Sequence, residues 1–417
     1  MDVNNGNILW KLRLGIEERN SCPVYADGKL YVPMLDDPDA HDAAGTKGVM
    51  YIIKPTDKDG QIVAHVTLDG RCFGTPTPYN GKIYIQTTRH LYCFGNAGNN
   101  PELPSAPAPE QWPAPGPAAS LQIIPSEVLM RPGQTESFRV RALDANGLTV
   151  EEIQDASKIK WASFIPATAK VKSTMKAEFN GQGQLVAASD EMPSAGAFMA
   201  QDGALKGFIR GRILPYLPIS QDFEKFSLTE TNAMDGAMYS YPPLPWIGAR
   251  FKFDIRDLNG NKVLAKNMDN PFFQRATVFI GEPSTKNYTV EADIMTEGNK
   301  RVNSSAVGLV NQRYYIVMRP ATSNIVVNST EALFHYEAPF ASAPNTWYHM
   351  KTRVDVAPDG SGIIRGKLWK KGDPEPDAWT IEAHHKHANT EGSPGLFAFA
   401  PQKRVYIDNV TVTSNEK

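Results

Sequence analysis

Polar and aromatic side chains occur together at one point in the C-terminal half of the chain. Asn311, Gln312 and Arg313 offer hydrogen-bond donors and acceptors, and Tyr314 follows them directly. Trp369 and Trp379 add aromatic rings later in the same region. An aromatic ring can stack on the face of a sugar while neighbouring polar groups bind the sugar hydroxyls. These residues form the candidate ligand-binding set, and the alternative that the aromatics pack in a core stays open.

A second candidate is the histidine cluster at residues 384–387. Because side chains on one face of a strand recur at every second residue, His385 and His387 would share a face and could bind a metal ion together. The sequence places no third ligand beside them. The alternative, a polar edge of a hairpin, is favoured.

No motif in the sequence marks a catalytic centre. Cleavage of a glycosidic bond needs an acid and a base that face each other, and the carboxylates here form no array of that kind. A nucleophile elbow and a phosphate-binding loop are absent from the sequence. We therefore predict no catalytic residues, and a binding role is favoured over an enzymatic one.

Composition excludes several classes of protein. The chain has 417 residues, enough for several domains, and 32 glycines and 32 prolines, which suit short strands joined by turns. A net charge of −2 gives no general attraction to nucleic acid. No apolar run is long enough to span a membrane, and the first ten residues are no signal peptide. Cys22, Cys72 and Cys93 match no zinc pattern; a Cys72–Cys93 disulfide stays open beside the favoured reading of small hydrophobes.

The first 95 residues contain an internal repeat. Residues 21–32, which include P-V-Y-A-D-G-K-L-Y-V, align with residues 74–85, which include P-T-P-Y-N-G-K-I-Y-I. Asp27-Gly28 and Asn80-Gly81 supply the residues that tight hairpin turns require, and alternating apolar residues flank both turns. Short strands in units of this kind predict blades of a β-propeller.

These motifs resemble the blades of PQQ-like (quinoprotein-type) β-propellers, a family with quinone-dependent dehydrogenases and a non-enzymatic assembly lipoprotein. The resemblance covers residues 1–95 and implies about two blades, fewer than the four that close a ring. We expect earlier blades and a signal peptide before Met1 in the complete protein. Bound PQQ is not expected in this part of it.

Two further regions follow the repeat. Residues 96–119 are rich in proline and predict an extended linker. Residues 120–217 predict a small β-sandwich with a buried tryptophan. Their phrases R-P-G-Q and D-A-N-G resemble bacterial Ig-like domains, which usually act as spacers in exported proteins.

Residues 218–417 alternate apolar and polar residues over most of their length, which predicts a two-sheet jelly roll. The expected strands include Tyr288–Ile294, Ala306–Val310, Trp347–Val354, Ile363–Trp369 and Val405–Val412. The phrases N-T-W-Y-H-M-K, G-K-L-W and Y-I-D-N-V resemble the concanavalin-like sandwiches of laminin-G-type and 3-keto-glycoside hydrolase-type domains. The whole layout resembles PQQ-like propeller proteins of planctomycete-type bacteria.

That resemblance implies a site for a structural calcium ion. In many sugar-binding jelly rolls, a carboxylate from each end of the domain binds Ca²⁺. Glu224, near the start of the domain, and Asp408, in its last expected strand, occupy the matching positions. Oxygen ligands of this kind suit the ion, and the alternative is that both are ordinary acidic residues.

Together these features predict an exported, all-β binding or scaffold protein, periplasmic or extracellular, whose C-terminal sandwich binds a polysaccharide or glycoconjugate. Other proteins of the cell envelope are further expected partners; nucleic acid is not. Two alternatives stay open: the C-terminal part of a PQQ-dependent dehydrogenase, and a sandwich that cleaves glycosides.

Overall fold

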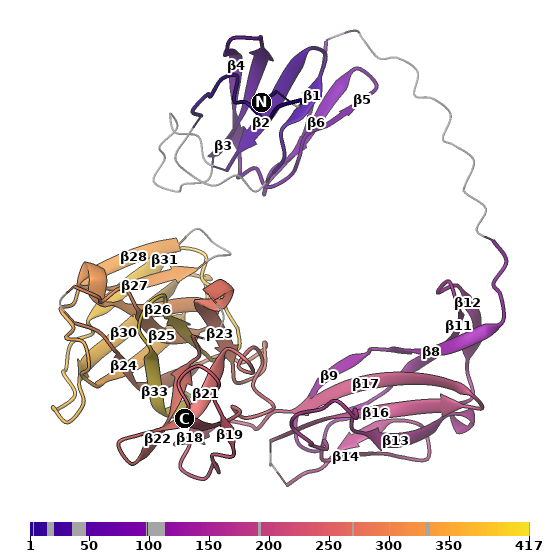
Figure 1. Cartoon of the computed structure of the whole chain (residues 1–417), viewed down its shortest axis with the longest axis vertical. Coiled ribbons are helices and arrows are strands. Elements are labelled where there is room, and N and C mark those ends of the chain that lie inside the picture. Colours follow the sequence, from indigo (N-terminus) through magenta and orange to yellow (C-terminus); the bar gives the residue numbers. More distant parts are fainter. Residues whose placement is uncertain are drawn as a thin grey trace. The chain divides into compact units, whose positions relative to one another are not determined.

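The computed structural model describes residues 1–2, 4–14, 21–35, 47–96, 98, 113–190, 193–268, 271–299, 301–329 and 334–416. The chain divides into two compact units, Met1–Pro113 and Ala114–Lys417. Strands dominate both (Figure 1), so the chain is all-β, as predicted. Most of the predicted linker at 96–119 lies outside the described residues.

Helical structure in the described part of the chain is limited to short 3-10 segments. These are η1 (Ala156–Lys158), η2 (Pro271–Phe273) and η3 (Pro320–Thr322). Among the described residues, no helix is long and apolar enough to cross a membrane.

The N-terminal unit contains two small antiparallel sheets. The first has four strands in chain order: β1 (Val24–Ala26), β2 (Lys29–Met34), β3 (Lys47–Pro55) and β4 (Gly60–Asp69). The second has three: β5 (Thr77–Tyr79), β6 (Lys82–Gln86) and β7 (Leu91–Phe94). Asp27 and Gly28 have φ of 49° and 66°, and Asn80 and Gly81 have 49° and 71°, so both predicted hairpin turns are confirmed. Whether these sheets are propeller blades stays a prediction.

Residues 114–214 form three sheets around one hydrophobic core. Their strands are β8 (Ala118–Ile124), β9 (Glu127–Met130), β10 (Thr135–Glu136), β11 (Arg139–Asp144), β12 (Thr149–Ile153), β13 (Lys160–Phe164), β14 (Ala177–Phe179), β15 (Leu185–Ala187), β16 (Ser194–Asp202) and β17 (Leu205–Ile213). Trp161, predicted to be buried, is half-buried and stacks on Phe179 with ring centroids 3.9 Å apart. The Ig-like identity of this region stays a prediction.

The C-terminal part is the predicted two-sheet jelly-roll sandwich. Its larger sheet has ten strands: β18 (Ile219–Gln221), β19 (Glu230–Thr231), β20 (Met238–Ser240), β21 (Phe253–Leu258), β22 (Asn261–Lys266), β24 (Tyr288–Thr296), β29 (Tyr348–Val356), β30 (Gly362–Lys370), β31 (Ile381–His385) and β33 (Val405–Ser414). Its smaller sheet has six: β23 (Arg275–Phe279), β25 (Ala306–Asn311), β26 (Tyr314–Arg319), β27 (Asn324–Ser329), β28 (Phe334–Pro339) and β32 (Gly395–Phe399).

The core of the sandwich lies between these two sheets. On β29, Tyr348, Met350, Thr352 and Val354 point inward and are buried, while the residues that alternate with them point outward. The six-stranded sheet contributes Leu309 and Ile316 to the same core. The inward residues of each sheet are therefore committed to packing, whereas the two outer faces are open to a ligand.

Candidate functional site

The outer face of the six-stranded sheet carries three aligned rows of side chains. Arg275 pairs with Phe399, which pairs on its other side with Ala306. Val307 pairs with Met318 in the next strand, so this row continues to Arg319. The row therefore crosses four adjacent strands, β23, β32, β25 and β26.

The two neighbouring rows complete the face. The second contains Thr277, Phe397 and Gly308, and the third brings Tyr315 beside Asn328 and His335. Small residues, Ala306 and Gly308, lie at the centre on β25. The surface is hollowed there, and the surrounding side chains line a groove of about 420 Å³.

Aromatic rings line this groove. Phe397 meets Tyr315 edge to face, with ring centroids 5.6 Å apart, and both are half-buried. The Tyr315 hydroxyl accepts a hydrogen bond of 3.4 Å from Thr277 Oγ1. The rings are thus held by packing but keep part of their surface open to a ligand.

Cationic side chains stand beside the rings. Arg275 lies over the ring of Phe399, 5.9 Å from its centroid, and both Arg275 and Arg319 are exposed. Among the described residues, neither guanidinium group has a carboxylate within ion-pair distance. His335 Nε2 lies 3.9 Å from Glu337 Oε2. The groove therefore combines an aromatic lining with unpaired positive charge.

The outer face of the ten-stranded sheet has a different character. At its centre Asp293, almost fully buried, accepts hydrogen bonds from His349 Nδ1 at 2.7 Å, Lys371 Nζ at 2.7 Å and Asn409 Nδ2 at 2.8 Å. The second ring nitrogen of His349 lies 3.1 Å from Glu291 Oε2. Both ring nitrogens of His349 therefore have a carboxylate partner.

These contacts fix the charge of His349. Burial opposes the charged ring, but the hydrogen bonds that the ring donates to Asp293 and Glu291 outweigh it and raise the pKa of His349 to about 9. The same contacts lower the pKa of Glu291. His349 is therefore an imidazolium ion at neutral pH and cannot act as a general base in this arrangement.

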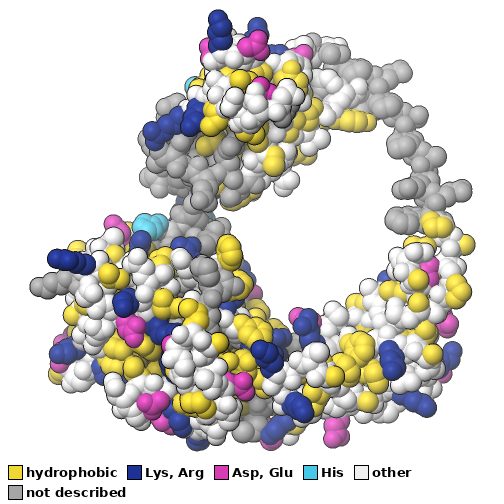
Figure 2. All heavy atoms as spheres, viewed as in Figure 1, with side chains coloured by type: hydrophobic (Ala, Val, Ile, Leu, Met, Phe, Trp, Pro, Cys, Tyr) yellow, Lys and Arg dark blue, Asp and Glu magenta, His cyan; other side chains and the backbone are white. Residues whose placement is uncertain are grey.

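Other cations on this face are paired as well. Lys351 and Lys367 contact Glu375 at 3.4 and 2.9 Å, and Arg353 and Arg365 both contact Asp355. Acidic and basic side chains are interspersed over the C-terminal unit in Figure 2.

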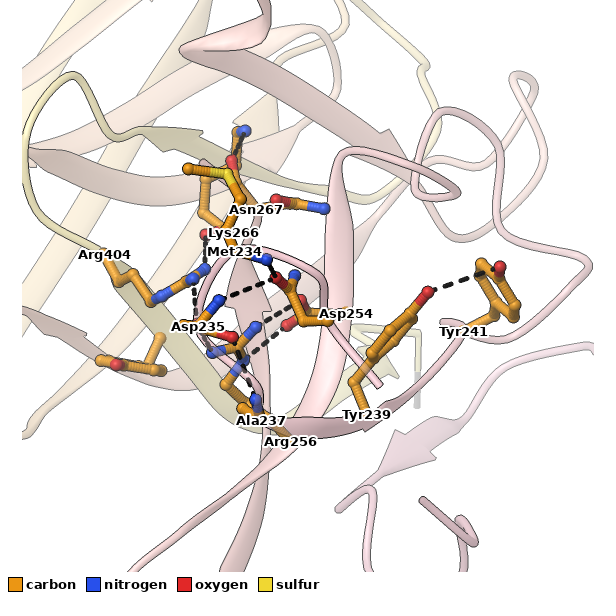
Figure 3. A network of polar contacts seen from close by, with 12 residues as sticks. Met234, Asp235, Ala237, Tyr239, Tyr241, Asp254, Arg256, Lys266, Asn267 and Arg404 are labelled. Atoms are coloured by element: carbon orange, nitrogen blue, oxygen red, sulfur yellow. Dashed lines mark hydrogen bonds and ion pairs between the residues drawn. The ribbon is translucent and has the colours of Figure 1, made fainter. Parts of the chain in front are cut away.

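A further paired network lies on β21. Arg256 binds Asp254 through two hydrogen bonds, of 2.8 and 2.6 Å, and also contacts Asp235 at 2.8 Å. Figure 3 shows Asp235 between Arg256 and Arg404, whose Nη2 donates to it at 2.6 Å. This network holds residues 232–237 against the sheet, which gives these charges a structural role.

The predicted tryptophans lie on this paired face. Trp369 contacts the ring of His349, with centroids 4.6 Å apart, and Trp379 lies 4.8 Å from Lys367 Nζ. Both are half-buried. Trp379 also borders an open hollow with Arg353 and Arg365. The two rings thus lie on the outer face of the ten-stranded sheet, whereas Asn311 and Tyr314 of the predicted cluster point into the core from the other sheet.

Three members of that cluster are buried. Asn311, Gln312 and Tyr314 expose 0%, 1% and 0% of their surface. Asn311 Nδ2 donates to the backbone oxygens of Tyr288 and Thr352, both at 3.1 Å. These side chains hold the sandwich together and offer a ligand no surface, which corrects their place in the candidate set.

The fourth member, Arg313, lies in a tight turn. Gln312 and Arg313 connect β25 to β26 with φ of 46° and 68°. Arg313 is exposed and lies 4.0 Å from Glu391. Its position at the sheet end separates it from the groove rows that begin with Tyr315.

The histidines do not form the shared-face pair that the sequence left open beside the favoured hairpin edge. His385 Nδ1 lies 2.7 Å from the Tyr314 hydroxyl, and its ring stacks on Phe334 with centroids 4.4 Å apart. Burial lowers the pKa of His385. Strand β31 ends at His385, so His387 lies beyond it and does not share a strand face with His385.

The predicted calcium ligands both contact the first residues of β22. Asp408 is buried, and its carboxylate accepts from Asn261 Nδ2 at 2.9 Å and from the Asn409 backbone N–H at 2.8 Å. Glu224 accepts from the Lys262 backbone N–H at 2.8 Å. A calcium ion bound by these two carboxylates stays a prediction. Within the described part of the chain, no group of three or more His, Cys, Asp or Glu side chains is arranged to hold a metal.

The described cysteines are free thiols. Cys72 is buried, which raises its pKa to about 11, and Cys22 and Cys93 are exposed. The Cys72–Cys93 bridge left open by the sequence is therefore not formed in this structure.

Most groove residues were missed from the sequence. The alternation in Gly395–Phe399 does place Phe397 and Phe399 on one face, opposite Leu396 and Ala398. Because both faces of this strand are apolar, periodicity alone does not say which one is outside. Arg275 and Arg319 lie 44 positions apart in the sequence, and only strand pairing places them in the same row.

The chain is similar to several solved structures at low identity. They include an alginate lyase of family PL-14 from Aplysia kurodai (9% identity, 39% of this chain and 87% of that one, TM-score 0.29) and an endo-β-1,4-glucuronan lyase from Trichoderma reesei (11%, 47% and 94%, 0.27). Another is the exoplasmic/lumenal domain of VIP36 in its Ca²⁺/Man2-bound form (9%, 41% and 81%, 0.27). No family model and no curated protein matches the sequence.

Proposed function

We propose that the C-terminal sandwich binds a glycan chain in the groove over the six-stranded sheet. The observation that carries this proposal is the groove itself, a hollow of about 420 Å³ lined by aromatic rings and hydrogen-bonding side chains. Recognition sites for small ligands combine apolar surface with a few placed polar groups in this way.

The chemistry of a sugar matches these two kinds of surface. The C–H groups on one face of a pyranose pack against an aromatic ring, here Phe397, Phe399 or Tyr315. Its hydroxyls exchange hydrogen bonds with groups such as the Asn328 amide. Because these residues lie on paired strands with a fixed register, their spacing is set before a ligand arrives.

The rest of the chain has a supporting role in this proposal. The small sheets within residues 24–94 and the sheets within residues 118–213 contribute no residue to the lining of the groove. We propose that they act as scaffold modules of an exported protein, in the periplasm or outside the cell.

Affinity electrophoresis of the 417-residue chain through gels with neutral and acidic polysaccharides tests glycan binding. We expect retardation by at least one of them and a loss of retardation in Phe397→Ala. Trp379→Ala, an aromatic truncation on the opposite sheet, is the matched control and should leave mobility unchanged. If no polysaccharide retards the chain, or if Trp379→Ala alone abolishes retardation, the proposal fails. Far-UV circular dichroism confirms that both variants are folded.

A further inference from the structure

The groove differs from the outer face of the ten-stranded sheet in its unpaired arginines. Arg275 and Arg319 are exposed at opposite ends of one cross-strand row, and among the described residues neither has an ion-pair partner. On the other sheet, Arg353 and Arg365 share Asp355. The difference therefore lies in the placement of carboxylates, because both sheets carry arginines.

The acidic residue nearest in the rows is already engaged. Glu337 accepts a hydrogen bond of 2.8 Å from Asn324 Nδ2 and lies 3.9 Å from His335. Glu337 lies on β28 and pairs with Val326, so it is outside the first row. Among the described residues, the row that contains Arg275 and Arg319 therefore has no carboxylate. Positive charge in the groove is therefore not compensated by the groove itself.

The strand register sets the separation of the two guanidinium groups. From β23 to β26 there are three strand spacings, which place the two backbones roughly 14 Å apart, since neighbouring strands lie about 4.8 Å apart. Phe399 and the small Ala306 lie between them. A chain laid along this row would meet a cation, an aromatic ring, a hollow and a second cation in turn.

We propose that the groove selects an anionic polysaccharide, one whose sugars carry carboxylates or sulfate esters. The proposal rests on glycan binding in the groove and names the class of glycan. The planar guanidinium group donates two parallel hydrogen bonds to a carboxylate or a sulfate, which a neutral sugar lacks. Arg275 and Arg319 bind the anionic groups while Phe397 and Phe399 pack against the rings.

Three polymers with one backbone test this proposal: dextran, carboxymethyl dextran and dextran sulfate. They differ only in the anionic group, so comparison of the last two also tells carboxylate from sulfate recognition. The double variant R275Q/R319Q removes both groove cations. R353Q is the control for overall charge, since it removes one cation, half-buried and paired with Asp355, from the other sheet.

We expect the chain to bind at least one anionic polymer at least tenfold more tightly than dextran, and the double variant to lose most of that preference. R353Q should change affinity less than twofold. Equal binding of all three polymers by the wild-type chain overturns the anionic class but leaves glycan binding standing. Equal losses in R353Q and in the double variant also overturn it, because they show attraction to overall charge. No binding to any polysaccharide removes the proposed function itself.

Discussion

The two outer faces of the C-terminal sandwich are built by the same alternation of residues but use it differently. On the ten-stranded sheet, Asp293 joins His349, Lys371 and Asn409 in one closed network. On the six-stranded sheet, Arg275 and Arg319 flank aromatic rings and small residues. A face whose charges satisfy one another gains little from a ligand, because each ligand contact replaces an existing one. A face with unpaired donors and open rings can gain from binding.

The largest expected effect is on the paired face. Asp293→Ala removes a buried carboxylate and leaves Lys371 and the Nδ1 of His349 without this partner, which should lower the free energy of unfolding by about 3 kcal/mol. Urea unfolding followed by tryptophan fluorescence measures this loss. Affinity for the anionic polymers should stay within twofold of wild type, and a tenfold loss of affinity would move the binding site to this face.

Its control is Asp359→Ala. Asp359 lies in an exposed turn and contacts Ser361 alone among the described side chains. This variant should lower the free energy of unfolding by less than about 1 kcal/mol. Equal costs for the two aspartates would show that the Asp293 network contributes nothing special to stability.

The next effect is a pH dependence that belongs to the same network. The pKa of His349 is raised to about 9, so the stabilisation is fully present below the ordinary histidine pKa of about 6.5 and is lost as the pH rises through 9. We expect the free energy of unfolding to fall by about 2 kcal/mol between pH 6.5 and 9.5. His349→Gln should remove most of this slope, and an unchanged slope in that variant would assign it to another group.

A smaller effect is expected in the groove. Phe399→Ala removes the ring beneath Arg275 and should weaken polysaccharide binding about tenfold, equivalent to about 1.4 kcal/mol. Equilibrium binding measured by isothermal titration calorimetry gives the ratio. Unchanged affinity would mean that this aromatic ring does not contact the ligand.

The smallest effect concerns the tryptophan that the sequence favoured. Trp369→Phe keeps an aromatic ring beside His349, so stability should change by less than about 1 kcal/mol. The affinity for polysaccharide should be unchanged in the same titration. A loss of affinity would show that Trp369 contributes to polysaccharide binding, and the two faces would then not differ in this function.

Local signals predicted part of this fold well. Two hairpin turns could be predicted from Asp27-Gly28 and Asn80-Gly81, because few other residue pairs adopt positive φ readily. The strand expected at Trp347–Val354 is β29, since alternation along Tyr348–Val356 is nearly perfect.

The groove could not be predicted by the same reasoning. Gln312 and Arg313 form a tight turn without the usual glycine, so no local signal indicated that Asn311 and Tyr314 belong to strands and point inward. The row from Arg275 to Arg319 exists only through the pairing of β23, β32, β25 and β26. Pairing between distant strands is a property of the whole fold, and one strand's pattern does not contain it.

The most direct test of the difference between the faces is a crystal structure of the chain with an oligosaccharide cut from the anionic polymer it binds best. We expect the ligand over β23, β32, β25 and β26, with anionic oxygens about 2.7–2.9 Å from the Arg275 or Arg319 guanidinium nitrogens, the length of a charge-assisted hydrogen bond. A ligand bound against Trp369 and Trp379, or one in the groove that contacts neither arginine, would contradict it.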